Sequence, residues 1–227
     1  MGSPNMPGQS ESGGAVSAGG RRIRGLDADE RRAQRRDQIL VAAFELFARD
    51  GYANTAIEQI CQTAYVGNKA FYELFESKED CYLTLLAQIA ERVEVAVAEA
   101  MGQAAPDEDE RQILRRVLSA FAHTLADDPR VAVVAFGESA GVSPRVEGRR
   151  RENRRRTAEF LEALWRAHHP ANDRTDYQAL SVATVGGLFE LVAESVHRPE
   201  PRPIDDLITD LTTFVLVVEA GIGQLGA

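Results

Sequence analysis

The polar side chains best suited to recognising a partner lie between residues 55 and 78, within short helical patterns. In the short helix expected from Asn68, the helical period turns Phe71 inward and its neighbours outward. The outward set comprises Asn68, Lys69, Ala70, Tyr72 and Glu73. Lysine pairs with the acceptors of guanine and asparagine with adenine. The pattern therefore fits readout of base edges in a DNA major groove, although three small packed helices with no nucleic-acid partner would give the same periodicity.

Three predicted helices position this set. Apolar residues recur at helical spacing from Arg31 to Asp50, and Gly51 follows as a left-handed stop. A second helix is expected over residues 56–63 and a third over 68–74, joined by a short turn. Two short helices joined in this way form a helix-turn-helix, whose second helix enters the major groove.

The second predicted helix has a recognisable start. Thr55 and Glu58 have the spacing of a capping box, in which each side chain accepts a hydrogen bond from the other residue's backbone amide. Thr55 is therefore expected to be the N-cap. Cys61 supplies a small residue where the two helices cross.

Composition narrows the function classes. The chain has 227 residues and a net charge of -9, yet its first 75 residues are neutral and the remainder carries the whole negative excess. Cys61 and Cys81 are too far apart in sequence for a zinc or redox pair, so a reducing compartment is expected. No nucleophile elbow, phosphate loop or metal-binding histidine pair occurs, so we expect no enzyme, no metal and no cofactor.

The N-terminal stretch is rich in glycine, serine and proline, and residues 1–28 are expected to form a disordered arm. Seven arginines fall in or just after it: Arg21, Arg22, Arg24, Arg31, Arg32, Arg35 and Arg36. Two interpretations stay open, a solubilising tail and an arm that contacts phosphates or the minor groove.

The rest of the chain is also helical in pattern, so the expected fold class is all-α. The expected helices cover residues 78–102, 113–125, 131–139, 145–168, 176–196 and 203–222. An arginine tract over residues 149–156 is interpreted mainly as a solvated helix start paired with acids, with an anionic partner as the alternative. No apolar run appears long enough to span a membrane, and no signal sequence is recognised, so the expected location is the cytoplasm.

The apolar residues of the C-terminal half suggest two further surfaces. The last two helices are more apolar than one chain needs, and Gly186 and Gly187 allow a close backbone approach. Five aromatic side chains are candidates for a ligand pocket, with plain core packing as the alternative. They are Phe121, Phe136, Trp165, Tyr177 and Phe189.

One continuous stretch carries a family resemblance. It comprises Ile39, Leu40, Ala42, Ala43, Leu46, Phe47, Gly51, Tyr52, Thr55, Ile57, Ile60, Val66, Phe71, Tyr72, Phe75, Ser77, Lys78 and Glu79. Residues 31–86 thereby resemble the N-terminal domain of TetR-family regulators. The resemblance implies a DNA-binding domain over residues 29–77 and a helical effector-binding and dimerisation domain over residues 78–227.

The resemblance also implies roles for individual residues. Thr55, Tyr72 and Lys78 would contact backbone phosphates, while Gly67, Asn68, Lys69 and Ala70 would belong to the DNA-binding surface. A cap, a core aromatic and a solvated charge are the structural alternatives for the first three. Where the family usually has glycine in the turn, this chain has Tyr65, so backbone strain is expected. Gly67 stands where the family usually has serine and is a weaker cap, and Ala70 stands at a frequent threonine or serine position and cannot hydrogen-bond phosphate.

The implied function is that of a sequence-specific transcriptional regulator. The expected mechanism is repression that ends when a small-molecule effector releases the protein from its operator. The implied partners are palindromic operator DNA, an unknown effector and a second copy bound through the last two helices, with no membrane partner. The alternative is a helical adaptor that binds proteins and no specific DNA.

Overall fold

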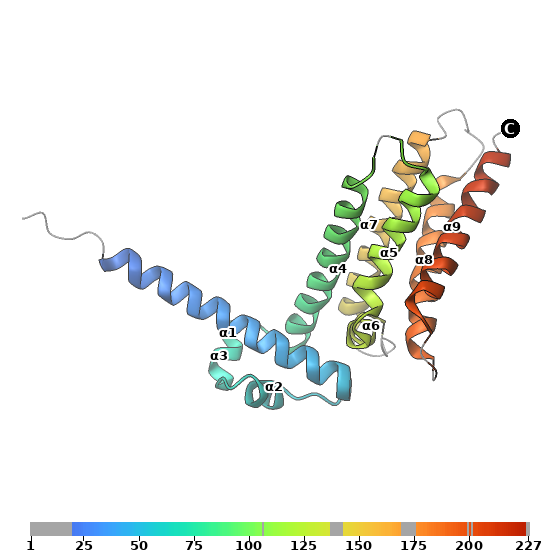
Figure 1. Ribbon diagram of the computed structural model, residues 1–227. Coiled ribbons are helices and arrows are strands. Elements are labelled where there is room, and N and C mark those ends of the chain that lie inside the picture. Colours follow the sequence, from blue (N-terminus) through green and yellow to red (C-terminus); the bar gives the residue numbers. More distant parts are fainter. Residues whose placement is uncertain are drawn as a thin grey trace, which may run out of the picture.

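The computed structural model describes residues 20–105, 107–136, 143–168, 176–198, 200 and 202–225, and the described part contains nine helices and no strand (Figure 1). Their bounds are α1 Gly20–Asp50, α2 Ile57–Thr63, α3 Asn68–Tyr72, α4 Lys78–Gly102, α5 Glu110–Ala126, α6 Pro129–Phe136, α7 Pro144–His168, α8 Tyr177–His197 and α9 Ile204–Leu225. The expected all-α fold is confirmed. The expected boundaries hold within about four residues except at the start of α1.

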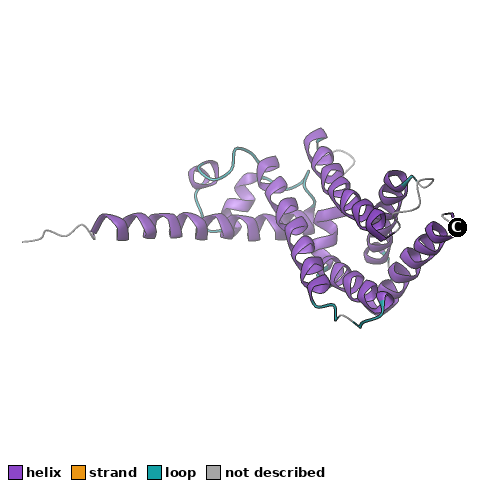
Figure 2. Cartoon of the chain, turned by 90° about the horizontal axis from the view of Figure 1, so that it is seen from above, coloured by secondary structure: helices purple, strands orange, loops and turns teal. Residues whose placement is uncertain are grey.

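Helix α1 begins much earlier than the apolar pattern suggested. It starts at Gly20, so the expectation of disorder up to residue 28 is wrong for residues 20–28. Figures 1 and 2 show that the N-terminal part of α1 projects far beyond α2 and α3. Side chains 27–35 are all exposed, which explains why hydrophobic periodicity could not reveal this part of the helix. Residues 1–19 lie outside the described chain.

The first three helices enclose one end of the hydrophobic core. Ile39, Ala43 and Phe47 of α1 are buried in the same cluster as Ile60 of α2 and Phe71 of α3. Gly51 ends α1 with a φ of 80°, and its amide donates to the Phe47 carbonyl oxygen at 3.1 Å. This left-handed stop confirms the sequence expectation.

Helix α4 leads from this domain into the C-terminal bundle. Ser77 caps it by accepting a hydrogen bond from the Asp80 amide at 3.1 Å. In Figure 1, α4, α5, α7, α8 and α9 stand roughly side by side, while α6 lies at the end of the bundle that faces α1. Helix α1 contacts both α4 and α6, so two elements of the bundle support the N-terminal domain.

The last two helices pack on each other at a close approach. A Cβ added to Gly187 of α8 would lie 2.8 Å from Cζ of Phe214 on α9, so this glycine lets the aromatic ring against the backbone. Gly186 faces open space instead. The expectation of a close approach through both glycines therefore holds within the chain for Gly187 alone.

Helix α8 is long and apolar enough to cross a bilayer by length and composition alone, which corrects the expectation that no such stretch exists. A core helix of a packed protein meets the same criteria. Here α8 packs against α7 and α9, with further contacts to α5 and α6. Only 28% of its most apolar window is buried within the chain, so an apolar surface of α8 stays uncovered.

Candidate functional site: an exposed short helix and an arginine-lined cavity

Helix α3 presents its polar side chains to solvent, as its sequence predicted. Asn68, Lys69 and Glu73 are exposed, and Tyr72 is 59% exposed. Phe71 points the other way and is completely buried beside Phe75. The buried ring fixes the rotation of α3 about its axis and thereby fixes which side chains face outward.

The outward charges of α3 are only weakly engaged with each other. Nζ of Lys69 lies 3.8 Å from Oε1 of Glu73, and both side chains are exposed. Such a surface pair contributes little stability and is readily exchanged for a phosphate or a base. Lys69 is therefore available to an external acceptor.

The start of α3 leaves backbone amides exposed. Gly67 is the N-cap with φ −77° and ψ 153°, and it has no side chain to satisfy the first amides of the helix. Gly67 is exposed and Ala70 is half-buried. Neither offers a polar side chain, so any contribution of these two positions to DNA binding is through backbone groups or shape.

Thr55 does not have the position that its spacing suggested. The N-cap of α2 is Ala56, and Oε1 of Gln59 accepts from the Ala56 amide at 2.7 Å, so the expected Thr55–Glu58 capping box is wrong. Thr55 is 1% exposed, and its hydroxyl donates to the Gly51 carbonyl oxygen at 2.8 Å. The side chain fastens the loop between α1 and α2 rather than facing the surface.

Lys78 is likewise used inside the domain. Its Nζ donates to the carbonyl oxygens of Tyr52 at 2.8 Å and Thr55 at 2.7 Å, and it lies 4.3 Å from the centre of the Tyr52 ring. Burial lowers the pKa of this amine. Lys78 therefore links α4 to the α1–α2 loop. Neither the phosphate contact nor the solvated charge considered from the sequence anticipated this link.

The strain expected in the turn is present. Tyr65 has a φ of 55°, the only positive value among the described residues other than glycine, and its side chain is 96% exposed. The backbone bends through the left-handed region while the ring lies in solvent and contributes no packing to offset the cost.

A small cavity of about 70 Å³ lies among α4, α6, α7 and α8. Phe136 and Phe189 line it, and Phe121 packs edge-on against Phe189 with ring centres 5.5 Å apart. These three of the five predicted pocket aromatics therefore come together. Trp165 and Tyr177 belong to a separate buried cluster with Ile222 and do not line this cavity.

Most of the polar lining of the cavity comes from α7, and Glu94 of α4 adds a carboxylate. Arg150 is 8% exposed, and its Nη2 donates to Oη of Tyr82 at 3.0 Å and to the carbonyl oxygen of Val134 at 3.2 Å. Its Nε is buried without a hydrogen-bond partner, and its nearest carboxylate, Glu147, is 3.5 Å away. Arg154 lies over the ring of Phe189, 5.6 Å from its centre. The cavity thus combines apolar walls with an incompletely satisfied cation.

Sequence reasoning missed Arg150 because it lies within a run of arginines. Elsewhere in that run the solvated interpretation holds: Arg155 and Arg156 pair with Glu152, and Arg155 also pairs with Glu159. The one available signal was the helical register, because Val146 and Arg150 lie one turn apart on the same face and both are buried.

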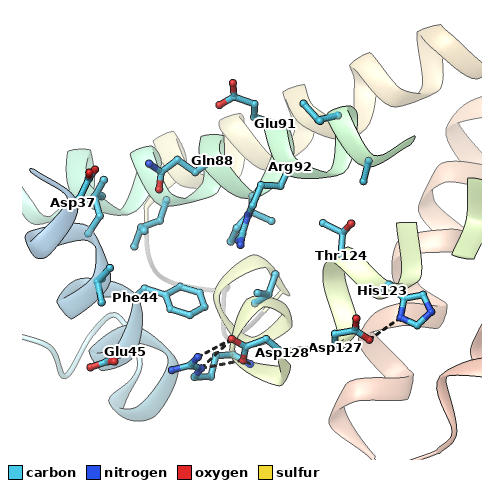
Figure 3. Close-up of a pocket in the computed structure, with 18 of the residues that line it drawn as sticks. Asp37, Phe44, Glu45, Gln88, Glu91, Arg92, His123, Thr124, Asp127 and Asp128 are labelled. Atoms are coloured by element: carbon cyan, nitrogen blue, oxygen red, sulfur yellow. Dashed lines mark hydrogen bonds and ion pairs between the residues drawn. The ribbon is translucent and has the colours of Figure 1, made fainter. Parts of the chain in front are cut away.

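A larger hollow of about 870 Å³ is an open groove between α1, α4 and the α5–α6 corner (Figure 3). Figure 3 shows Asp37 and Phe44 of α1 on one side and Gln88 and Arg92 of α4 above them. The acidic groups in it are paired in part, with Asp128 bound to Arg130 and Asp127 to His123. No described element of this groove leaves a buried polar atom unsatisfied.

Within the described part of the chain, no cluster of three or more histidine, cysteine or acidic side chains could hold a metal ion. Cys61 and Cys81 are both buried and free.

Known proteins resemble this chain most clearly in the region that contains α3. Residues 39–85 match the family of bacterial regulatory proteins described as the tetR family. The HTH-type transcriptional activator FasR of Mycolicibacterium smegmatis is 30% identical over 130 residues, covering 57% of this chain and 56% of FasR. TcmR, an HTH-type transcriptional regulator of Streptomyces glaucescens, is 41% identical over 56 residues, which is 25% of each chain. The matches thus span about half of the first relative and a quarter of the second.

Solved structures share the fold over most of their length. The fatty acid degradation regulator FadR of Bacillus halodurans has a TM-score of 0.67 at 21% identity, over 80% of this chain and 94% of that one. FadR of Bacillus subtilis, solved with stearoyl-CoA, has a TM-score of 0.66 at 20% identity, over 78% and 96%. The range matched by the family lies inside residues 31–86, where the sequence showed its resemblance.

Proposed function

We propose that this chain, whose residues 39–85 match the tetR family of bacterial regulatory proteins, is a ligand-responsive transcriptional regulator that binds operator DNA through α3. The exposed face of α3 carries this proposal. Asn68 and Lys69 supply base-reading groups, and Tyr72 supplies a hydroxyl for a backbone phosphate. Thr55 and Lys78 are left out of the contact surface because their polar groups already bind within the domain.

We propose that two copies associate through α8 and α9. Val182 of α8 is 57% exposed and Val217 of α9 is 66% exposed, which is unusual for large apolar side chains on two packed helices. Gly186 faces open space beside them and permits a close approach. A two-fold dimer would set two α3 helices at a fixed separation and select a palindromic site.

The effector site is assigned to the cavity beside Arg150 rather than to the larger open groove. The apolar walls and the buried cation favour an amphipathic anion, whose carboxylate or phosphate would pair with Arg150 or Arg154. The FadR protein of Bacillus subtilis was solved with a molecule of this kind, stearoyl-CoA. About 70 Å³ is too small for such a ligand, so binding requires α7 or α8 to move, and that movement would couple binding to α4 and the DNA-binding domain.

The regulator would act in the cytoplasm by occluding its operator, without catalysis, metal or cofactor. Its effector would release it. A helical adaptor that binds protein through the same surfaces is the competing function, and no described feature favours it over DNA.

The test is selection of bound duplexes from a random-sequence DNA pool by the purified full chain. The proposal expects enrichment of an inverted repeat, and addition of stearoyl-CoA as a probe is expected to weaken binding to the selected duplex. Recovery of unenriched sequence would refute specific DNA binding. Enrichment of an inverted repeat together with no response to stearoyl-CoA would retain the DNA assignment and reject a long-chain acyl-CoA as effector.

A further inference from the structure

The part of α1 beside the end of α3 has a face that is rich in arginine. Successive residues of an α-helix turn by about 100°, so Arg31, Arg32, Arg35 and Arg36 occupy less than half of the helix circumference. By the same register Glu30 and Asp37 lie on the opposite side, while Asp29 lies at the edge of the arginine face.

Two of these arginines show where the arginine face lies relative to α3. Nη2 of Arg32 donates to the carbonyl oxygen of Glu73, the C-cap of α3, at 3.2 Å. The guanidinium of Arg36 lies 4.9 Å from the centre of the Phe75 ring, just beyond α3. The arginine face is therefore fastened to the end of the DNA-reading helix.

The other two lie beside them around the circumference of α1. Arg31 and Arg35 are exposed, and neither contacts α2 or α3 in the described hydrogen bonds and ion pairs. Arg31 pairs with Asp27 one turn earlier, where both side chains are more than half exposed. Such a solvated pair is weak and can be exchanged for another anion. In the sequence, Arg21, Arg22 and Arg24 precede this part of α1.

We infer that the arginine face of α1 is a second DNA-binding element, in which Arg31 and Arg35 bind backbone phosphates of the duplex beyond the bases read by α3. This rests on the proposed function. The occupant is DNA because the face lies at the end of the DNA-reading helix and the charged side chains that it presents there are arginines, two of which stay free of α2 and α3. Guanidinium groups bind phosphate oxygens in a two-pronged geometry without sequence preference. The element would add affinity and a longer contact region, while specificity would remain with α3.

The test compares two duplexes that carry the same selected operator, one trimmed to its conserved bases and one extended by random-sequence flanks. The variant is Arg31→Gln/Arg35→Gln. The matched control is Arg149→Gln/Arg151→Gln, which removes the same charge from exposed positions on α7. Affinity is measured by fluorescence anisotropy across a salt series.

The wild type and the α7 control are expected to bind the extended duplex about tenfold more tightly than the trimmed one. The Arg31→Gln/Arg35→Gln variant should lose this advantage, and its slope of log affinity against log salt should fall by about 2 for each bound protomer. Equal wild-type affinity for both duplexes, or a variant that keeps the wild-type slope on the extended duplex, overturns the inference while specific operator binding stands. Failure of the wild type to bind any duplex overturns this inference and the proposed function together.

Discussion

Arg150 of α7 donates a hydrogen bond to the hydroxyl of Tyr82 on α4, and Tyr82 packs edge-on against Phe47 and Tyr52 of the DNA-binding domain. The Tyr82 hydroxyl in turn donates to the Val134 carbonyl oxygen of α6 at 2.7 Å. Buried Tyr82 therefore connects Arg150, which lines the cavity, to the N-terminal helices. Burial raises the pKa of this phenol, while the Arg150 charge opposes the shift.

The Tyr82→Phe variant removes the shared hydroxyl and keeps the ring. We expect the free energy of unfolding to fall by about 1 kcal/mol, because a buried hydrogen bond is lost and Arg150 retains only the Val134 carbonyl and Glu147. Urea denaturation measures this. Tyr72→Phe is the matched control, since that hydroxyl is on an exposed ring, and its stability should equal the wild type. Equal stability of both variants would contradict the described network.

Replacing Tyr65 with glycine should stabilise the chain. Relief of a left-handed non-glycine conformation is worth about 1–2 kcal/mol, and the extra freedom of glycine in the unfolded chain costs about 0.5–1 kcal/mol. No packing is lost, because the ring is exposed. A rise in Tm for Tyr65→Gly, with none for Tyr65→Ala, is the expected result of thermal denaturation. A lower Tm for Tyr65→Gly would contradict the strained turn.

Gly187→Ala should destabilise the pairing of α8 with α9. The new Cβ would lie under 3.0 Å from two atoms of the Phe214 ring, and overpacking of this kind costs about 1–3 kcal/mol. Gly148→Ala on α7 is the control, since a Cβ there meets nothing within 4 Å and alanine favours the helix. Denaturation midpoints should move in opposite directions. A stabilised Gly187→Ala protein would show that the two helices are further apart.

The cysteines should be unreactive in the folded chain. Burial raises the pKa of Cys81 to about 12 and also raises the pKa of Cys61. At pH 8, a thiol-reactive chromophore is expected to label no cysteine in the folded protein and both after unfolding in urea. Because the unfolded thiol ionises near pH 9 and the folded Cys81 near 12, its contribution to stability is complete below pH 9 and is lost as the pH rises toward 12. Fast labelling of the folded protein would contradict the burial of Cys81.

The sequence predicted helix ends and helix faces well where single residues mark them. Gly51 after an apolar period gave the end of α1, and Phe71 gave the rotation of α3. Backbone strain at Tyr65 was predicted because the family that this stretch resembles usually has glycine at that position. The start of α1 was missed because the side chains of residues 27–35 are all exposed, and a helix without a buried face leaves no apolar period.

The site was predictable where residues face solvent and not where they serve the interior. Asn68, Lys69 and Tyr72 lie as expected. Thr55 and Lys78 were assigned to phosphates, yet their polar groups bind backbone carbonyls of the α1–α2 loop, contacts that depend on tertiary packing. Arg150 was hidden in a charged run because only the packing of α7 against α4 and α6 distinguishes it from its neighbours.

The central claim is that α3 contacts the bases, and its most direct test is the affinity of Asn68→Ala/Lys69→Ala for the selected duplex. We expect affinity to fall about 100-fold or more, because each base contact is worth about 1–3 kcal/mol, while the helical circular dichroism and the dimer mass stay unchanged. A folded, dimeric variant that binds the selected duplex as tightly as the wild type would contradict the account.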